Sequence, residues 1–393
     1  MPDTTEMPNS PAPLLPPPWH SDDRSRPRIR DVRVILTAPE GTRLVVVKVE
    51  TDEPELYGLG CATFTQRPLA VATAIEEYLR PQVIGRSVHD IEDLWSMLAV
   101  SSYWRSGPVL NNAMSGLDMA LWDAVAKARR VPLWKLLADR YNGGKFDDKA
   151  WVYAAGGYYY PGKDLDGLQD EMKHYLDLGY STVKMKIGGV PLADDLKRIE
   201  AVLKVIGGKG ENLCVDVNGR YDLDQALACG AAIAPYNLRW YEEPLDPLDY
   251  LLHAALATRY APPLATGENL FSMQDARNLI RHGGLRPDRD VLQFDPALSY
   301  GLVEYLRTLA MLQRHGWSGR RCVPHGGHQF ALNIAVGLGL GGNESYPDVF
   351  APFGGFADDC PVENSLVRLP DIPGVGFEAK SALYRVMRPL AEG

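Results

Sequence analysis

The sequence predicts an α/β protein in which a β/α barrel follows a small N-terminal α+β domain. The prediction rests on regularly spaced acidic residues, a change of pattern near residue 150 and a balanced composition. Asp216, Glu242 and Glu268 lie 26 residues apart, and each ends a short apolar run. A strand, a helix and two loops take about 25 to 30 residues in such a barrel. The spacing therefore fits one carboxylate at the end of each of three successive strands.

The first 148 residues have a different pattern from the rest. Residues 1–27 are rich in proline and lack the basic start and apolar core of a secretory signal, so we expect an extended arm. Residues 28–148 contain three alternating runs and then helical periodicity. The expected strands span residues 32–36, 44–50 and 57–60, and the expected helices span 70–79, 91–98 and 110–127. Strands followed by helices predict an α+β capping domain, against which we expect residues 370–393 to pack.

Residues 149–369 are predicted to form the barrel. Polar residues end further apolar runs on both sides of the carboxylates, at Lys186, Asp295, His325 and Glu344. Helix-like stretches separate these runs, as the crossovers between parallel strands require. The polar termini are therefore expected on successive strand–helix units.

Composition indicates one large soluble protein. The chain has 393 residues, of which 46% are hydrophobic and 23% charged, so it can bury a barrel core and a second unit. No run of about 18 apolar residues predicts a membrane helix. The net charge of −9 argues against nucleic acid or an anionic membrane as a partner. Five scattered cysteines suit reduced thiols in the cytoplasm.

Lys184 and Lys186 stand two residues apart in the apolar run before the carboxylates. Side chains alternate across a strand, so both ammonium groups share one face. Two like charges repel, which is expected to lower a lysine pKa toward the working range of a general base. Paired lysines on an exposed edge strand are the ordinary alternative. Their place one unit before the carboxylates favours catalysis.

The three carboxylates suit a metal ion. They are hard oxygen ligands with no cysteine or histidine among them, which favours Mg²⁺ over zinc. Without a cation they would have to form separate salt bridges. Glu242 and Glu243 face opposite sides of the strand, and spacing alone does not choose between them.

His325 and Asp295 end adjacent strands in the proposed register. A carboxylate that accepts the Nδ1 proton of an imidazole fixes its tautomer and leaves Nε2 to transfer a proton. His325 is therefore a candidate catalytic residue. His328, in the same glycine-rich turn, is expected to be structural.

Together these residues resemble the mandelate racemase subgroup of the enolase superfamily, from about residue 28 to the end of the chain. Lys184-Met185-Lys186 is similar to the Lys-x-Lys base motif, with Lys186 as the catalytic lysine. In the family's second metal motif the glutamate two places before the proline is the ligand, so Glu242-Glu243-Pro244 selects Glu242. Thr266-Gly267-Glu268-Asn269 supplies the third ligand. Asp295 and His325 match the family's dyad, and Glu344 its acidic residue after the eighth strand.

The resemblance implies a (β/α)7β modified TIM barrel with an N-terminal capping domain. One Mg²⁺ per subunit would be held by Asp216, Glu242 and Glu268. The expected substrate contacts come from Asn218, Glu344, Lys184 and Arg105. Relatives form dimers and octamers, so a homo-oligomer is also expected.

The barrel and the cap resemble different branches. The barrel segments 152–163, 292–295, 324–329 and 343–347 are similar to D-tartrate dehydratase, and the cap segments 35–39, 67–72 and 103–109 to the mannonate dehydratase branch. The implied reaction removes the α-proton of a 2,3-dihydroxy carboxylate and eliminates the β-hydroxyl to give a 2-keto acid. The first expectation is conversion of D-tartrate to oxaloacetate.

Three alternatives remain open at the level of the sequence. One is a dehydratase of mannonate or another aldonate, because cap loops in this superfamily contact the distal part of the substrate. Another is a racemase or epimerase of a 2-hydroxy acid, because a lysine and a histidine can each remove or return one α-proton. The third is a regulatory barrel that binds a ligand without turnover.

Overall fold

The computed structural model describes residues 26–62, 67–101 and 109–392. Its first element is an antiparallel sheet of three strands in chain order, with β2 in the middle. The strands are β1 (Ile29–Thr37), β2 (Leu44–Thr51) and β3 (Tyr57–Ala62). Every residue of β2 is buried, as its run of β-branched side chains favours. These strands extend the predicted ones by a few residues at their ends.

Helices follow this sheet in the chain. They are α1 (Pro68–Thr73), a π-helical turn (Ala74–Leu79), α2 (Arg80–Val83), α3 (Ile91–Ser101), α4 (Leu110–Ala128) and α5 (Leu133–Tyr141). Of these, α1, α2 and α4 pack against the sheet. Helix α4 lies directly on β3, because both present small residues. A Cβ added at Gly58 would lie 1.8 Å from the carbonyl oxygen of Ala120, and one at Gly60 would lie 2.1 Å from that of Gly116. The glycines of β3 therefore set how closely the helix approaches.

The second unit is a ring of parallel strands. In chain order they are β4 (Ala150–Gly156), β5 (Val183–Lys186), β6 (Leu213–Asp216), β7 (Trp240–Glu242), β8 (Leu264–Thr266), β9 (Val291–Leu292) and β10 (Asn343–Ser345). Each strand from β4 to β9 pairs in parallel with the next, and β10 returns to pair with β4. A short extended segment at Cys322 fills the remaining place. It bridges Leu292 on one side and receives a hydrogen bond from the backbone N–H of Gly341 on the other, at 2.9 Å.

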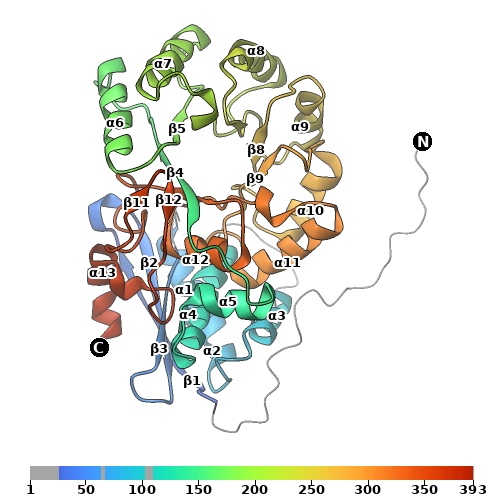
Figure 1. The fold of residues 1–393 in the computed structure, drawn as a ribbon. Coiled ribbons are helices and arrows are strands. Elements are labelled where there is room, and N and C mark those ends of the chain that lie inside the picture. The colour runs from blue at the N-terminus through green and yellow to red at the C-terminus, as the bar shows by residue number, and fades with distance from the viewer. Residues whose placement is uncertain (1–25, 63–66, 102–108, 393) are drawn as a thin grey trace, which may run out of the picture.

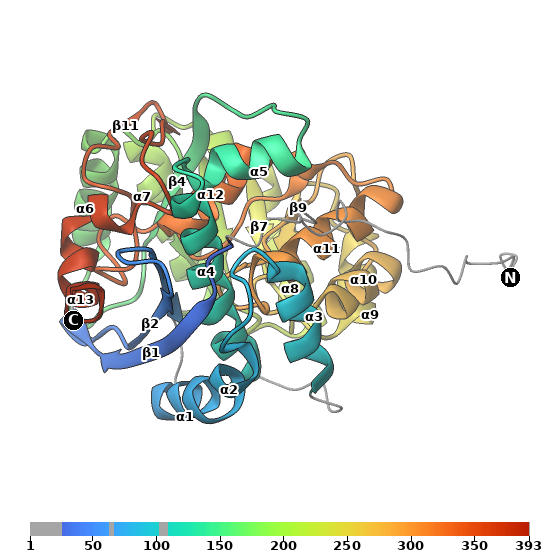
Figure 2. The ribbon, with the colours of Figure 1, turned by 90° about the horizontal axis from the view of Figure 1, so that it is seen from below.

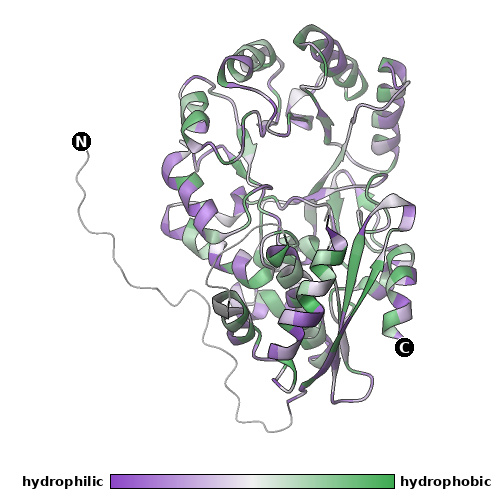
Figure 3. Ribbon diagram, turned by 180° about the vertical axis from the view of Figure 1, so that it is seen from behind, coloured by the Kyte–Doolittle hydropathy of each residue, from purple (hydrophilic) through white to green (hydrophobic). Residues whose placement is uncertain are grey.

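One helix follows each strand from β4 to β9, another follows the segment at Cys322, and together they surround the ring (Figure 1). They are α6 (Leu165–Asp177), α7 (Leu192–Val205), α8 (Leu223–Ile233), α9 (Tyr250–Ala257), α10 (Met273–His282), α11 (Leu302–Arg314) and α12 (Gln329–Leu338). Figure 3 shows these helices alternating between hydrophobic and hydrophilic residues, as expected for helices with one face on the strands and one in solvent. The predicted (β/α)7β barrel with an N-terminal capping domain is therefore confirmed.

The end of the chain returns to the N-terminal sheet. A short hairpin of β11 (Val362–Glu363) and β12 (Leu366–Val367) adds to the start of β4. The last helix, α13 (Ser381–Ala391), packs against β1, β2 and β3, as Figure 2 shows from below. We retain the domain boundaries after residues 27, 148 and 369 as predictions.

The cap holds the loop that starts at the carboxyl end of β9. The indole N–H of Trp95 donates to the carbonyl of Tyr300 at 2.8 Å, and the side chain of Asn111 donates to that of Leu298 at 2.5 Å. Asp118 of α4 accepts the backbone N–H of Leu302 at 2.6 Å and so caps α11. A side chain at Gly301 would collide with Asp118, 2.4 Å from its Oδ2. Asp295 lies in this loop, so the cap supports a segment of the candidate site.

Within the described ranges, no helix is long and apolar enough to cross a membrane. All five cysteines are buried and free.

Candidate active site

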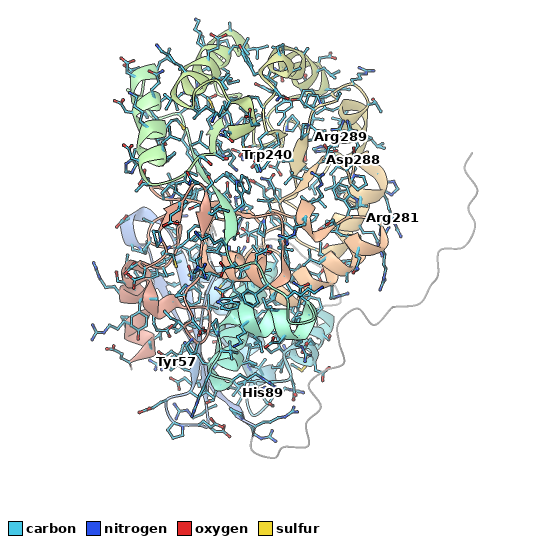
Figure 4. All side chains as sticks on the ribbon, viewed as in Figure 1. Tyr57, His89, Trp240, Arg281, Asp288 and Arg289 are labelled. Atoms are coloured by element: carbon cyan, nitrogen blue, oxygen red, sulfur yellow. The ribbon has the colours of Figure 1, made fainter. Side chains whose placement is uncertain are left out.

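The register of the barrel brings the predicted polar residues to one end. In the parallel ladders Lys186 lies beside Asp216, and Asp216 beside Glu242. Glu268, Asp295 and His325 lie in the loops just beyond the ends of their strands. The interior below them is filled by a separate apolar cluster that includes Tyr153, Trp240 and Val291. Figure 4 shows the labelled Trp240 among the barrel strands.

Asp216, Glu242 and Glu268 form the predicted cluster of carboxylates. Each is buried and offers an oxygen atom that lies within 4.8 Å of the other two. Glu243 points elsewhere, because its carboxylate accepts a hydrogen bond from the side chain of Asn269 at 2.8 Å. The geometry therefore makes Glu242, and not Glu243, the candidate metal ligand.

The charges in this cluster suit a cation. Burial and the neighbouring Asp216 raise the pKa of Glu242 to about 8, although the Lys184 ammonium lowers it. Among the described residues, no donor lies within hydrogen-bonding distance of the buried Oε2 of Glu268. Three buried oxygen ligands fit a hard divalent ion such as Mg²⁺. The trio is therefore a candidate metal centre.

Lys184 lies deeper than Lys186 and is tied to carboxylates. Its Nζ lies 2.6 Å from Oε1 of Glu242, 2.6 Å from Oε1 of Glu344 and 3.4 Å from Oδ2 of Asp216. The Nζ of Lys186 makes a short contact with Oδ2 of Asp216 and lies 5.1 Å from the centre of the Tyr158 ring. Both lysines therefore reach the carboxylate cluster from β5.

The prediction that the pKa of one lysine is lowered was wrong, because both pKa values are raised. Burial lowers the pKa of Lys186 and Asp216 raises it, with a net rise above the ordinary value, although Lys184 lowers it as predicted. The pKa of Lys184 is likewise raised, because Glu242 and Glu344 outweigh its burial. The sequence did not show that each ammonium would face a carboxylate directly.

His325 and Asp295 form the predicted pair. Nδ1 of His325 lies 2.9 Å from Oδ2 of Asp295, and its Nε2 lies 3.7 Å from Oε2 of Glu268 and 3.8 Å from Oε2 of Glu344. Burial lowers the pKa of His325, but Glu268, Glu344 and Asp295 raise it, with a net value of about 10. This environment favours the protonated imidazole, whose Nε2 is directed toward the carboxylate cluster.

His328 has the contacts of a structural residue. Its Nδ1 accepts the backbone N–H of Ala331 at 3.1 Å and caps α12. Its Nε2 lies 3.4 Å from Oδ1 of Asp295. It therefore holds the far side of the carboxylate that faces His325.

The expected substrate contacts occupy different positions. Glu344 is buried between Lys184 and the backbone N–H of Gly326, which donates to its Oε2 at 3.0 Å. Asn218 has a left-handed backbone, φ 52°, which asparagine tolerates, and its side chain lies 3.5 Å from Oε1 of Glu268. Arg105 and most of the arm 1–27 lie outside the described residues.

Three aromatic residues beside the site were not predicted from the sequence. The hydroxyl of Tyr346 lies 3.2 Å from Nε2 of His325, and the indole N–H of Trp240 donates to Oε2 of Glu242 at 2.8 Å. Tyr158 lies beside Lys186, and its ring centre is 6.4 Å from that of Phe350. Trp240 lies two residues before Glu242 and Tyr346 two after Glu344, so strand alternation could have placed both side chains on the interior face.

In TIM-barrel enzymes the active site lies at the carboxyl ends of the strands, where these carboxylates gather. Comparison with known protein families gives matches to enzyme domains of this fold. The family "Enolase C-terminal domain-like" matches residues 167–383, and "Mandelate racemase / muconate lactonizing enzyme, N-terminal domain" matches residues 23–138. The chain belongs to the mandelate racemase/muconate lactonizing enzyme subgroup of the enolase superfamily.

Two curated relatives extend over most of the chain. A D-galactonate dehydratase family member from Catenulispora acidiphila is 36% identical over 335 residues, which cover 79% of this chain and 75% of the relative. Another member, from Enterocloster bolteae, is 32% identical over 397 aligned residues, and the match covers 90% of this chain and 93% of that relative. One protein thus resembles both the cap and the barrel.

A solved structure has the same fold. L-talarate dehydratase from Polaromonas sp. JS666, crystallised with Mg and L-glucarate, has a TM-score of 0.76 and 27% sequence identity. The match covers 89% of this chain and 94% of that protein.

Proposed function

We propose that this chain is a Mg²⁺-dependent dehydratase of acid sugars, a hydro-lyase that removes water from a 2,3-dihydroxy carboxylate. The observation that carries the proposal is the placement of Lys186 and His325 at different ends of the carboxylate trio. Lys186 contacts Asp216, whereas Nε2 of His325 lies 3.7 Å from Glu268. A substrate bound between them would meet a base on one side and an acid on the other. The relatives named for D-galactonate dehydratase and the L-talarate dehydratase support the same reaction class.

The residues that would hold the metal are Asp216, Glu242 and Glu268. Mg²⁺ bound there supplies a Lewis acid that stabilises negative charge on the substrate carboxylate as the α-proton leaves. If Asp216 held the metal, its carboxylate would bind the Lys186 proton less strongly, and the adjacent Lys184 ammonium would favour neutral Lys186 further. Lys184 also offers a positive charge to the substrate carboxylate.

The elimination then uses one proton transfer at each end of the site. Neutral Lys186 takes the α-proton, and the electron pair of that C–H bond forms the new carbon–carbon double bond. The bond from the β-carbon to its hydroxyl breaks, and His325 gives its Nε2 proton to the departing oxygen to form water. The resulting enol tautomerises to a 2-keto acid. Asp295 keeps His325 oriented throughout.

D-tartrate is the first substrate that we propose, because the barrel segments around Tyr158, Asp295, His325 and Glu344 resemble D-tartrate dehydratase. The product would be oxaloacetate. The relatives named for D-galactonate support an aldonate as the second candidate. We propose that the enzyme works as a homo-oligomer, a dimer or an octamer, in the cytoplasm.

Proton NMR of the Mg²⁺-loaded protein in D₂O tests the function. With D-tartrate, we expect the α-proton signal to disappear while oxaloacetate or its decay product pyruvate accumulates. If D-tartrate is unchanged, D-galactonate, mannonate and galactarate are tested in the same way. Formation of a 2-keto acid from any of them supports dehydration. If none of these acids exchanges its α-proton or gives a keto acid, the proposal is wrong.

Racemisation is the second candidate function, because Lys186 and His325 approach the three carboxylates from different sides. In that case each residue removes or returns the same proton. The NMR experiment separates the two reactions, since racemisation exchanges the α-proton and inverts the centre without forming a keto acid.

Removal of the Tyr346 hydroxyl is predicted to slow the acid step. In Tyr346→Phe the Nε2 of His325 loses a partner at 3.2 Å. We expect dehydration to slow by roughly tenfold, the effect of one hydrogen bond. Stopped assays of keto-acid formation measure it, and calorimetric titration with Mg²⁺ should give an unchanged affinity. A normal dehydration rate would contradict the role of the hydroxyl.

A further inference from the structure

Lys380 is a buried lysine far from the candidate site in sequence. It lies just before α13, and 5% of the residue is exposed. Its Nζ donates to three consecutive backbone carbonyls, those of Phe353 at 3.0 Å, Gly355 at 2.7 Å and Gly354 between them. No carboxylate of the described residues forms an ion pair with it. Burying an ammonium group without a charged partner is costly, and hydrogen bonds to carbonyl oxygens offset part of that cost.

The segment that Lys380 holds, residues 353–355, supports the turn that carries His325. The backbone N–H of Gly355 donates to the carbonyl of Gly327 at 2.8 Å, and His328 forms bridges with Gly354 and Gly355. The Phe353 ring lies 4.9 Å from the His328 ring. Since His328 in turn contacts Asp295, this side of the segment leads to the Nδ1 end of His325.

The same segment also supports Tyr346. A Cβ added at Gly354 would lie 2.8 Å from the Cβ of Tyr346 and 3.1 Å from its carbonyl oxygen. The backbone of Gly354 therefore packs directly against Tyr346. The hydroxyl of Tyr346 lies 3.2 Å from Nε2 of His325. The segment thus contacts the partner of Nε2 directly and reaches Asp295, the partner of Nδ1, through His328.

We propose that Lys380 is a positioning residue that fixes the imidazole of His325 through residues 353–355. The inference deepens the proposed function and rests on it, since it concerns the residue that protonates the departing hydroxyl. Lys380 contacts neither the three carboxylates of the candidate metal centre nor the residues that would transfer protons. It acts by joining the C-terminal segment to the turn between the extended segment at Cys322 and α12.

The start of α13 has other ties to this region. The backbone N–H of Asp358 donates to the carbonyl of Ala379 at 3.0 Å, and Oδ2 of Asp358 accepts the N–H of Ser381 at 3.1 Å. Loss of the Lys380 ammonium should therefore loosen residues 353–355 while α13 remains docked. This separates a positioning role from a purely structural one.

Hydrogen exchange provides the first test. Full-length wild type, Lys380→Met and Lys380→Gln are compared at about pH 6, below the pKa of Lys380, which burial lowers to about 7 while Asp358 raises it. In Lys380→Met we expect peptides that cover residues 324–331 and 353–357 to exchange roughly tenfold faster, as expected for the loss of charged hydrogen bonds. Lys380→Gln keeps neutral donors and should fall between the two. If Lys380→Met does not fold, the comparison is made between wild type and Lys380→Gln.

Lys48→Met is the matched control. Lys48 is also buried and also holds the C-terminal segment by a backbone carbonyl, that of Ala391 at 3.4 Å, but it lies on β2. Its loss should leave exchange at residues 324–331 unchanged. Equal acceleration in the Lys48 and Lys380 variants would overturn the proposal, as would unchanged exchange in both Lys380 variants.

Kinetics provide the second test. In Lys380→Met we expect keto-acid formation to fall by up to about tenfold, no more than in Tyr346→Phe, while α-proton exchange by Lys186 continues. Equal losses of both activities would contradict a role confined to His325. If wild type acts on none of the acids, the proposed function fails, but the exchange result still decides whether Lys380 orders the His325 turn.

Discussion

A Lys186→Met protein is expected to lose α-proton exchange, whereas His325→Asn is expected to keep exchange and lose dehydration. Lys186 reaches the trio from β5 beside Asp216, and His325 reaches it beside Glu268. Without the base the first bond does not break, and the rate should fall by on the order of 10⁴-fold. Without the acid, Lys186 can still remove the α-proton, and a deuteron from the solvent can take its place. Proton NMR in D₂O follows exchange and keto-acid formation in one sample.

The two variants control each other, because they share the metal site and the substrate. Circular dichroism should match the wild type in both, and both should still bind Mg²⁺. If Lys186→Met turned over the true substrate at a normal rate, its assignment as the base would be wrong. If His325→Asn formed the keto acid normally, another residue would supply the proton.

Replacement of a trio carboxylate is expected to remove Mg²⁺ binding and with it all activity. Glu242→Gln replaces one of the three buried carboxylates of the candidate metal centre with a neutral amide. The loss of affinity should exceed the roughly 10- to 100-fold cost of losing a supporting partner of a ligand. Calorimetric titration measures the affinity. Chelation with EDTA should inactivate the wild type, and added Mg²⁺ should restore it.

Glu243→Gln is the control for this experiment. Glu243 is the next residue along the chain and equally buried, but its carboxylate faces Asn269. Its replacement should leave the Mg²⁺ affinity within a few-fold of wild type, roughly the effect of one neutral hydrogen bond. Loss of binding in Glu243→Gln but not in Glu242→Gln would reverse the assignment.

Thermal unfolding gives a second view of the metal centre. Mg²⁺ that binds only the folded protein stabilises it by about 2.7 kcal/mol at a free concentration 100 times the dissociation constant. The melting temperature of wild type should therefore rise with Mg²⁺, and that of Glu242→Gln should not.

Much of this arrangement could be predicted because strand spacing and register are encoded locally. The 26-residue interval placed Asp216 and Glu242 on adjacent strands, and the ladders pair them directly. Alternation along β5 placed Lys184 and Lys186 on the same face. The choice of Glu242 over Glu243 needed either the family motif or the structure, because neighbouring residues differ only in the direction of the side chain.

The remaining features depend on contacts between distant segments. The raised pKa of Lys186 follows from a carboxylate 30 residues away in sequence, and the hydrogen bond of Tyr346 to His325 follows from the packing of a loop. Lys380 contacts carbonyls more than 20 residues earlier, and no periodic pattern marks it. Sequence patterns predict which face a residue occupies but not which distant group it meets there.

The close contact between Asp118 and Gly301 limits which residues can replace either of them. The carboxylate caps α11 only because residue 301 has no side chain. A larger residue at 301 would displace α4, and a smaller one at 118 would leave the first turn of α11 uncapped. The two positions should therefore covary, and a chimaera that joins this barrel to another cap should fold only when both members of the pair are transferred together.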